Sequence, residues 1–317
     1  MHVVVTGGAG FIGSHLCDAL LSRGYQITCL DNLLSGRESN ISHLTGNAGF
    51  KFIMHDVTQS LPEMGKVDAI FHFASPASPN PESPVSYMSL PLETLMVNSI
   101  GTKNMLDLAR ASSCPIVLAS SSEVYGDPAV HPQVEEYWGN VSPNGPRSCY
   151  DEGKRFLEAI SFTYHRLYQT PIKVIRIFNT YGPRMRLDEG RFIPSLFASH
   201  FEKRPFSKFG SGTNTRSFCF VSDLIDGILK IFDSQISLGS VLNLGSDVEY
   251  AVNDVISLFE RITGEKLNTI QKPELAHDPK KRKPDLTKVK KLGYAPKISL
   301  EEGLKKLYDH YRQNESQ

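Results

Sequence analysis

The sequence predicts an α/β fold: a doubly wound parallel sheet with a smaller, interleaved α/β lobe. Short runs rich in β-branched residues recur along the chain and are almost continuously apolar, as expected of strands buried on both faces. Helical patterns separate several of these runs, and the alternation of strand and helix indicates right-handed βαβ units. The expected strands are residues 2–7, 26–31, 51–57, 69–75, 115–121 and 172–179.

The helical patterns lie where crossovers between parallel strands are needed. Apolar residues recur at helical spacing over 12–20, and a longer pattern runs from 92 to 110. After Asn179 the composition shifts towards Pro, Gly, Arg and Asp, but we expect the helical run 221–232 to return to the first layer. The sequence therefore predicts a larger domain and a smaller lobe, formed by residues 1–179 with 217–245 and by residues 180–216 with 246–317.

Composition argues against several classes of function. The 317 residues include 34 basic and 34 acidic side chains, so no net positive field attracts nucleic acid. No apolar run reaches the roughly 20 residues of a membrane-spanning helix. The five cysteines are scattered without a CxxC pair, which favours neither a disulfide framework nor a metal site. Because the first apolar strand follows the initiator Met directly, without a signal peptide, we expect a cytoplasmic protein.

A glycine-rich turn follows the first strand and opens into the first helix. Gly7, Gly10 and Gly13 permit a tight turn, close approach of a pyrophosphate and close packing of helix on strand. The helix begins near Phe11 and Ile12, where its amides face phosphate oxygens. Such a turn has limited specificity in isolation, but here it follows a strand, as in a Rossmann-type dinucleotide-binding domain.

The ends of the second and third strands carry carboxylates. Asp31 stands where a carboxylate hydrogen-bonds the ribose hydroxyls of NAD and repels the 2′-phosphate of NADP. The alternative is that Asp31 only caps the next turn, and Arg37 keeps NADP open as a cofactor. Asp56 and Val57 would flank the adenine, although a simple turn explains Asp56 almost as well. We expect the larger domain to bind NAD.

Tyr150 and Lys154 stand four residues apart and share one face of a predicted helix. A nearby ammonium and the positive nicotinamide are expected to lower the pKa of the Tyr150 phenol, so that it acts as a base near neutral pH. By itself this spacing usually marks surface residues. The strand that ends in the segment Ser120–Gly126 and the glycine-rich turn favour the catalytic interpretation.

The glycine-rich turn, the 121–126 segment and the 150–154 segment together resemble the extended short-chain dehydrogenase/reductase family, over essentially the whole chain. This resemblance implies that Tyr150 removes a proton from a sugar hydroxyl. It also implies that Lys154 holds the nicotinamide ribose and that Ser121 hydrogen-bonds the same sugar hydroxyl. Further cofactor contacts implied by the resemblance are Asn32 and Ala74.

Residues at the sugar select among the members of this family. Sugar 4,6-dehydratases have an aspartate where this chain has Ser122, and simple 4-epimerases have no carboxylate at the position of Glu123. The pair instead resembles UDP-glucuronate decarboxylases. Other segments with the same resemblance are 71–79, 149–155, 177–185, 190–193, 215–218, 278–285 and 292–297.

The same resemblance implies a UDP-sugar site built from both lobes. Asn179, Arg191 and Arg216 fall in segments similar to the family's nucleotide-binding loops, and guanidinium groups suit a diphosphate. Arg282 would act with Glu123 to orient the sugar ring. In isolation the basic run 280–283 indicates only a solvated surface, and the sequence that follows it sets Arg282 apart.

Weaker candidates and two departures from the family pattern adjoin this site. Arg184 has little specific support, and Asn98 is also explained by hydrogen bonds within its own helix. The loop after Ala77 is longer than in UDP-glucuronate decarboxylases, and Met96 replaces a usual lysine. Both departures lie beside the expected sugar pocket and bear on the identity of the sugar.

The resemblance implies oxidation of carbon 4 of UDP-glucuronate, loss of carbon 6 as CO₂ and reduction of the ketone to give UDP-xylose. A UDP-glucuronate 4-epimerase, or another nucleotide-sugar epimerase or dehydratase, is the nearest alternative. A catalytically silent NAD-binding regulator is an alternative of another class, although a sensor needs neither Tyr150 nor Lys154. The family resemblance also implies a homodimer through the helices of Asn98 and Tyr150, with apolar Phe156 and Ile160 on the latter.

Overall fold

The structure is a computed structural model that describes residues 1–235, 238–273 and 281–315. Its centre is a seven-stranded sheet in the order β11-β6-β5-β4-β1-β2-β3, and every pair of neighbours is parallel. The predicted α/β fold is therefore confirmed. The strands are β1 (His2–Thr6), β2 (Gln26–Asp31), β3 (Phe50–Met54), β4 (Ala69–His72), β5 (Ile116–Ser121), β6 (Ile172–Ile177) and β11 (Ser240–Leu244).

Alternate residues of the central strands enter two different hydrophobic cores. Val3 and Val5 of β1 pack in one core and Val4 packs in the other. Along β4, Ile70 and Phe71 divide between the cores in the same way. Burial on both faces explains why these runs are continuously apolar rather than alternating.

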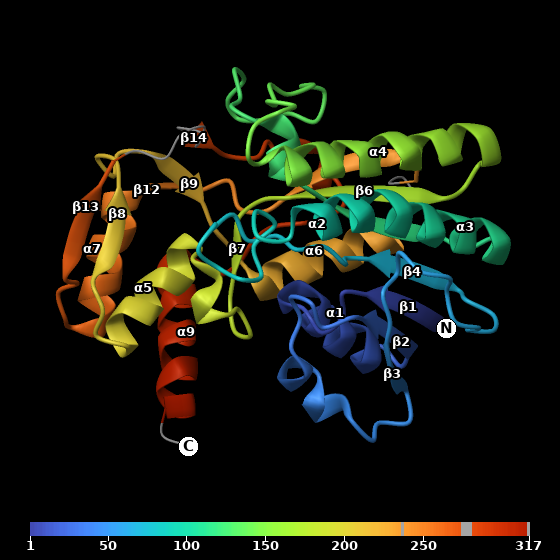
Figure 1. Cartoon of the computed structure of the whole chain (residues 1–317), viewed down its shortest axis with the longest axis horizontal. Helices are drawn as coiled ribbons and strands as arrows, with labels where there is room; N and C mark the ends of the chain where they lie inside the picture. Colours follow the sequence, from blue (N-terminus) through green and yellow to red (C-terminus); the bar gives the residue numbers. More distant parts are fainter. Residues whose placement is uncertain (236–237, 274–280, 316–317) are drawn as a thin grey trace.

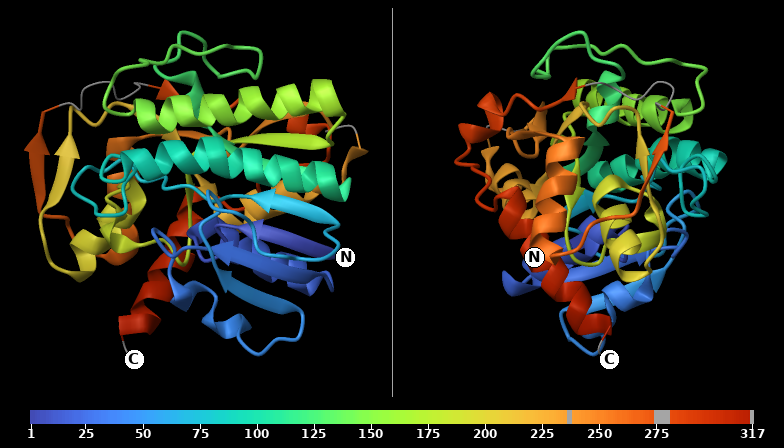
Figure 2. Two further views of the ribbon diagram at one scale, coloured as in Figure 1. Left: turned by 45° about the vertical axis from the view of Figure 1, so that its right-hand side comes forward. Right: turned by 90° about the vertical axis from the view of Figure 1, so that its left-hand side faces the viewer.

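Helices cover both faces of the sheet (Figure 1). One face packs against α1 (Phe11–Ser22) and α6 (Val221–Asp233), and residues of both helices belong to the larger core. The other face packs against α3 (Thr102–Ser112) and α4 (Ser148–Tyr168), which lie side by side in both views of Figure 2. The run 221–232 thus returns to the first layer, as predicted.

The long helix predicted over 92–110 is continuous but not uniformly α-helical. It consists of α2 (Pro91–Met96), a π-helical turn named η3 (Val97–Gly101) and α3. Asn98 lies buried in the π-helical turn, and its amide nitrogen donates to the Thr94 carbonyl and to Ser75 Oγ. These bonds support the structural interpretation of Asn98.

Three strands end two or three residues earlier than the sequence predicts. The strands expected to reach residues 57, 75 and 179 end at Met54, His72 and Ile177. Beyond these points the backbone leaves the ladder at the carboxyl edge of the sheet and lines a cleft. The apolar residues there mark the floor of a binding site rather than further strand.

The second lobe is a small α/β unit beside the carboxyl edge of the sheet (Figure 1). It contains one three-stranded sheet, in the order β12-β9-β14, and a two-stranded parallel pair, β13-β8. Its helices and strands are α5 (Phe192–Phe201), β8 (Phe206–Phe209), β9 (Thr215–Ser217), β12 (Glu249–Ala251), α7 (Val252–Thr263), β13 (Thr269–Lys272), β14 (Lys281–Arg282), α8 (Thr287–Lys290) and α9 (Leu300–Glu315). A short pair, β7 (Thr180–Tyr181) with β10 (Cys219–Phe220), lies where the chain passes between the lobes.

Candidate active site

A cleft of about 1300 Å³ lies between the two lobes, at the carboxyl edge of the central sheet. The strand order reverses between β1 and β4, and ligands of open α/β sheets bind at such a reversal. Apart from the weaker candidates Asn98 and Arg184, the structure brings every predicted site residue to this one cleft. They are Gly7, Gly10, Phe11, Ile12, Gly13, Asp31, Asn32, Asp56, Val57, Ala74, Ser121, Ser122, Glu123, Tyr150, Lys154, Asn179, Arg191, Arg216 and Arg282.

The glycine-rich turn forms a cradle that side chains would fill. Gly7 has φ +71°, and a Cβ there would lie 2.7 Å from the backbone nitrogen of Ala74. A Cβ on Gly13 would overlap the Gly7 carbonyl oxygen, so this glycine is needed where α1 crosses the turn. Helix α1 begins at Phe11 after Gly10, which supplies no capping side chain. The first amides of α1 are therefore available to a pyrophosphate, and the cradle fits a dinucleotide.

Asp31 lines the cleft and also holds the turn beside it. Its carboxylate accepts hydrogen bonds from the backbone nitrogens of Ala9, at 2.9 Å, and Leu33, at 2.8 Å. Burial raises the pKa of this carboxyl, and the two backbone bonds oppose the increase. Arg37 does not line the cleft. Its Nη2 instead donates a hydrogen bond to the Arg184 carbonyl oxygen at 3.3 Å. The geometry thus favours Asp31 over Arg37 in the choice of cofactor.

We expect the protein to bind NAD more tightly than NADP, by at least about tenfold, because a 2′-phosphate would meet the Asp31 carboxylate at close range. Titration of both cofactors by intrinsic fluorescence measures the ratio. Asp31→Ala should lower this preference for NAD over NADP. Arg37→Ala is the matched control and should leave the preference unchanged. Equal affinities in the wild type would assign the ribose site to Arg37.

Tyr150 and Lys154 lie on the first turns of α4, buried between this helix and β5. Lys154 Nζ donates to the Ala119 carbonyl at 2.8 Å and lies 5.6 Å from the centre of the Tyr150 ring. The decrease in the tyrosine pKa was predicted for the site with nicotinamide bound, and it stays a prediction. Burial raises the pKa of Tyr150 to about 12, although a hydrogen bond with Ser121 opposes the increase. Burial also lowers the pKa of Lys154 to about 7.

Glu123 is held between two arginines at the wall of the cleft. Arg282 forms a two-pronged ion pair with it, with Nη1–Oε1 at 2.5 Å and Nη2–Oε2 at 3.1 Å. Arg147 Nη2 lies 2.5 Å from Glu123 Oε2. Burial disfavours the charged carboxylate, but attraction by Arg147 and Arg282 outweighs this cost and lowers the pKa of Glu123 to about 2. The carboxylate is therefore ionised throughout the physiological range.

Arg147 was missed by the sequence analysis, although a signal existed. It precedes Tyr150 by three residues, one turn of α4, and so points to the same side of the chain. The basic run around Arg282 also divides as predicted. Lys281 is exposed and Arg282 is only 6% exposed, whereas Lys280 lies outside the described residues. Burial beside Glu123 distinguishes Arg282 from a solvated surface cation.

The weaker candidates do not line the cleft. The side-chain amide nitrogen of Asn98 donates to the Thr94 carbonyl of its own helix and to Ser75 Oγ. Arg184 pairs with Asp18 at 2.7 Å and lines a smaller cavity of about 340 Å³. Its φ of +68° belongs to the turn after β7. Arg184 therefore joins the two lobes rather than reaching the substrate.

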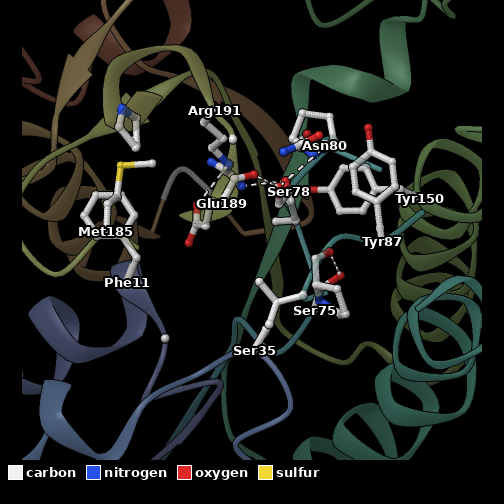
Figure 3. Close-up of a pocket in the computed structure, with 18 of the residues that line it drawn as sticks. Phe11, Ser35, Ser75, Ser78, Asn80, Tyr87, Tyr150, Met185, Glu189 and Arg191 are labelled. Atoms are coloured by element: carbon white, nitrogen blue, oxygen red, sulfur yellow. Dashed lines mark hydrogen bonds and ion pairs between the residues drawn. The ribbon is translucent and has the colours of Figure 1, made fainter. Parts of the chain in front are cut away.

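Tyr87 is a second residue that the sequence analysis missed. Its ring stacks on the ring of Tyr150, with centroids 4.7 Å apart and planes 12° apart (Figure 3). Tyr87 belongs to the long loop after Ala77, and no periodic pattern marks it there. Both departures from the family pattern reach the cleft, since its lining includes Asn80, Glu82, Val85, Tyr87, Met88 and Met96.

Within the described residues 1–235, 238–273 and 281–315, no group of three or more His, Cys, Asp or Glu side chains is placed to hold a metal ion. Among these same residues, no helix has both the length and the apolar composition that crossing a bilayer requires.

The model of the NAD dependent epimerase/dehydratase family matches residues 3–245. The chain belongs to this family. The match contains the glycine-rich cradle, Asp31 and the Tyr150–Lys154 pair, so the family's cofactor agrees with the fit of the cleft to NAD. Arg282, the partner of Glu123, lies beyond the matched region, in the second lobe.

Similar proteins narrow the family further. UDP-glucuronic acid decarboxylase 2 of Arabidopsis thaliana is 45% identical over 314 residues, which are 99% of this chain and 68% of that protein. UDP-glucuronic acid decarboxylase 1 of Xenopus tropicalis is 43% identical, over 98% of this chain and 72% of that protein. Among solved structures, UDP-glucuronic acid 4-epimerase from Bacillus cereus, in complex with UDP-glucuronic acid and NAD, has a TM-score of 0.85. Its sequence is 28% identical to this chain, and the match covers 99% of this chain and 100% of the epimerase.

Proposed function

We propose that this protein converts UDP-glucuronate into UDP-xylose, through a 4-keto intermediate and loss of carbon 6 as CO₂. The observation that carries the proposal is the clamped carboxylate, Glu123 between Arg147 and Arg282, in the same cleft as Tyr150 and Lys154. The relatives named as UDP-glucuronic acid decarboxylases support the choice of substrate, at 45% and 43% identity.

The cradle of Gly7, Gly10 and Gly13 would hold the pyrophosphate of NAD, and Asp31 would hold the adenosine ribose. Bound there, NAD would supply the hydride acceptor for carbon 4 of the sugar and, once reduced, the hydride donor for the ketone. Arg191 and Arg216 line the opposite, second-lobe side of the cleft, where guanidinium groups suit the diphosphate of a UDP-sugar.

Tyr150 accepts the proton of the sugar 4-hydroxyl when that carbon is oxidised. It does so as the phenolate: burial raises the pKa of the phenol to about 12, and the positive charges of Lys154 and of bound nicotinamide would favour loss of the phenol proton beforehand. Ser121 shares a hydrogen bond with Tyr150, and its Oγ also accepts one from the Glu123 backbone nitrogen at 3.2 Å. Ser121 therefore keeps the sugar hydroxyl, Tyr150 and the Glu123 turn in one arrangement.

Oxidation at carbon 4 places the carboxylate of carbon 6 in the β position to a ketone. The bond from carbon 5 to carbon 6 then breaks, CO₂ leaves and its electron pair forms an enolate at the ketone oxygen. Tyr150, now protonated, stabilises that oxygen, and a proton is added at carbon 5. Glu123 with its two arginines fixes the ring so that the breaking bond lies across the carbonyl plane, where the electron pair overlaps the π system.

An epimerase on the same fold is the closest alternative. The Bacillus cereus structure shows that a UDP-glucuronic acid 4-epimerase shares the fold at a TM-score of 0.85. Epimerisation requires the 4-keto sugar to rotate in the cleft, so that the hydride returns to its other face. Glu123 opposes this rotation because it fixes the ring. The Tyr150–Lys154 pair argues against a silent NAD-binding regulator, because a sensor has no need of a base beside the nicotinamide.

The direct test follows carbon 6. UDP-glucuronate labelled with ¹³C at carbon 6 is incubated with the protein and NAD, and the headspace and the nucleotide pool are analysed. We expect the label to leave as CO₂ in proportion to the UDP-xylose formed. Label retained in a nucleotide sugar would favour the epimerase, and unchanged substrate would favour the regulator.

We also propose that two copies pair through α2, η3 and α4. Leu92, Met96 and Ile100 form one stripe along these turns and are 67%, 41% and 45% exposed. Phe156 on the adjacent helix α4 is 48% exposed. Water-exposed apolar side chains on two adjacent helices support a surface that a second copy covers. Sedimentation equilibrium at micromolar concentration distinguishes the dimer from the monomer.

A further inference from the structure

The loop after β4 reaches across the cleft and bonds to the second lobe. Ser78 Oγ donates a hydrogen bond to the Glu189 carbonyl oxygen at 2.5 Å. In the opposite direction, Arg191 Nη2 donates to the Ala77 carbonyl oxygen at 2.5 Å. Figure 3 shows Ser78 and Asn80 beside Glu189 and Arg191, with the dashed bonds between them. Although it lies in a loop, Ser78 is only 3% exposed.

A third contact packs Asn80 against Gly190. Gly190 has φ +70°, and a Cβ there would overlap the Asn80 side-chain amide. Asn80 Oδ1 accepts a hydrogen bond from the Glu82 backbone nitrogen at 3.1 Å, which fixes the amide. Glycine at position 190 is thus required both by the backbone conformation and by the contact between the lobes.

The same loop is anchored at its other end on the catalytic helix. The Ser78 carbonyl accepts hydrogen bonds from the Tyr87 nitrogen at 3.1 Å and from Ser86 Oγ at 2.9 Å. Tyr87 stacks on Tyr150, and its carbonyl accepts a hydrogen bond from Cys149 Sγ at 3.3 Å. The loop is therefore a braced connection between the catalytic tyrosine and the second lobe.

The proposed reaction needs such a connection at one particular stage. The sugar is first oxidised, then loses CO₂ and is then reduced, so the 4-keto pentose must stay in the cleft until the hydride returns. Asn80, Glu189, Gly190 and Arg191 all line the cleft. If the lobes separated before the ketone is reduced, the intermediate could leave the cleft. Closure of domains over a bound substrate commits it to reaction in many enzymes.

We propose that residues 77–80 and 189–191 form a clasp that keeps the lobes together over the 4-keto pentose until its ketone is reduced. This inference rests on the proposed decarboxylation. If the clasp opens early, UDP-4-keto-pentose escapes after losing CO₂. One reduced cofactor then remains for each ketone released, because the hydride taken from carbon 4 has not been returned.

Two variants break the clasp from opposite sides, and each has a matched control. Ser78→Ala removes the hydrogen bond to Glu189, whereas Ser89→Ala removes a hydrogen bond to the Ser83 carbonyl within the same loop. Gly190→Ala forces a side chain against Asn80. Gly264→Ala imposes the same kind of backbone strain at φ +74°, but its Cβ would meet nothing within 4 Å.

The readout is the ratio of UDP-4-keto-pentose, trapped as a hydrazone, to UDP-xylose. We expect Ser78→Ala to raise this ratio about two- to tenfold, the range that follows from losing one net hydrogen bond. Gly190→Ala should raise it at least as much, because its side chain would overlap Asn80. Neither control should change it. In a Tyr150→Phe background, the two clasp variants should also speed dissociation of UDP-glucuronate, a measurement that needs no turnover.

The outcomes separate this inference from the proposed function. A wild-type protein that releases no CO₂ overturns decarboxylation, while the dissociation rates still test the clasp. If CO₂ is released but both clasp variants leave the ratio and the dissociation rate unchanged, the clasp is overturned. An equal rise in Ser89→Ala would also overturn it, because the cause would then be the stability of the loop and not the contact between the lobes.

Discussion

Tyr150→Phe should lower the rate of sugar oxidation by at least about 10³-fold, within the range for loss of a general acid–base group. The ring and its stacking on Tyr87 remain, so only the hydroxyl that accepts the sugar proton is removed. UDP-glucuronate should bind with nearly unchanged affinity. The affinity of the variant for NAD should also be unchanged, because Lys154 and the glycine-rich cradle are intact.

Single-turnover formation of NADH, followed by its fluorescence, measures this step, and calorimetry measures UDP-glucuronate binding. Tyr164→Phe is the control on the same helix: it removes a hydroxyl that bonds Asp107 at 2.7 Å, away from the cleft. It should keep wild-type oxidation. A near wild-type burst of NADH in Tyr150→Phe would mean that another residue accepts the proton.

Glu123→Gln should lower both oxidation and CO₂ release by more than about 100-fold, the magnitude expected of a lost positioning group. The substitution keeps the shape but removes the charge that holds Arg147 and Arg282. The buried Arg282 guanidinium then loses its counter-charge, Arg147 loses one of its ion pairs, and the ring loses its orientation. The free energy of unfolding should also fall, because the buried charge of Arg282 is left uncompensated.

Glu158→Gln provides the matched control for buried charge. Glu158 pairs with Arg176 at 2.7 Å, with side-chain exposures of 12% and 11%, close to the 14% of Glu123. It should lose stability to a similar degree but keep CO₂ release within a few-fold of wild type. If both variants lose activity equally, Glu123 is a structural residue and not part of the reaction.

The same pair predicts a pH dependence. The pKa of Glu123 lies at about 2 in the folded protein, below its ordinary value of 4.5. Its stabilising contribution is therefore complete above pH 4.5 and is lost as the pH falls towards about 2. Urea unfolding between these limits should show a decrease in wild type that is smaller in Glu123→Gln.

The fold could be predicted because its signals are local. A strand buried on both faces must be apolar at every position, so β1 and β4 are recognisable without knowing their neighbours. Where a strand ends is not local, because it depends on a pairing partner. Residues after His72 are as apolar as those before it, but they line the cleft instead of continuing the ladder.

The site divides in the same way. Tyr150 and Lys154 share a helix face, so spacing alone places them together, and Arg147 one turn earlier was accessible to the same argument. Glu123 and Arg282 are 159 residues apart, and only the family resemblance joined them. Tyr87 lies in a loop without periodicity. The pKa of Tyr150 also depends on burial, which raises it and which spacing does not reveal.

We expect this cleft to remove carbon 6 from UDP-glucuronate. The mass spectrum of the nucleotide sugar formed from UDP-glucuronate and NAD tests it most directly. We predict a UDP-pentose, lighter than the substrate by one CO₂, with the mobility of UDP-xylose. A product with the mass of the substrate and an inverted carbon 4 would contradict this account. It would mean that Met96 and the long loop that follows Ala77 allow the keto sugar to rotate in the cleft while its carboxylate stays attached.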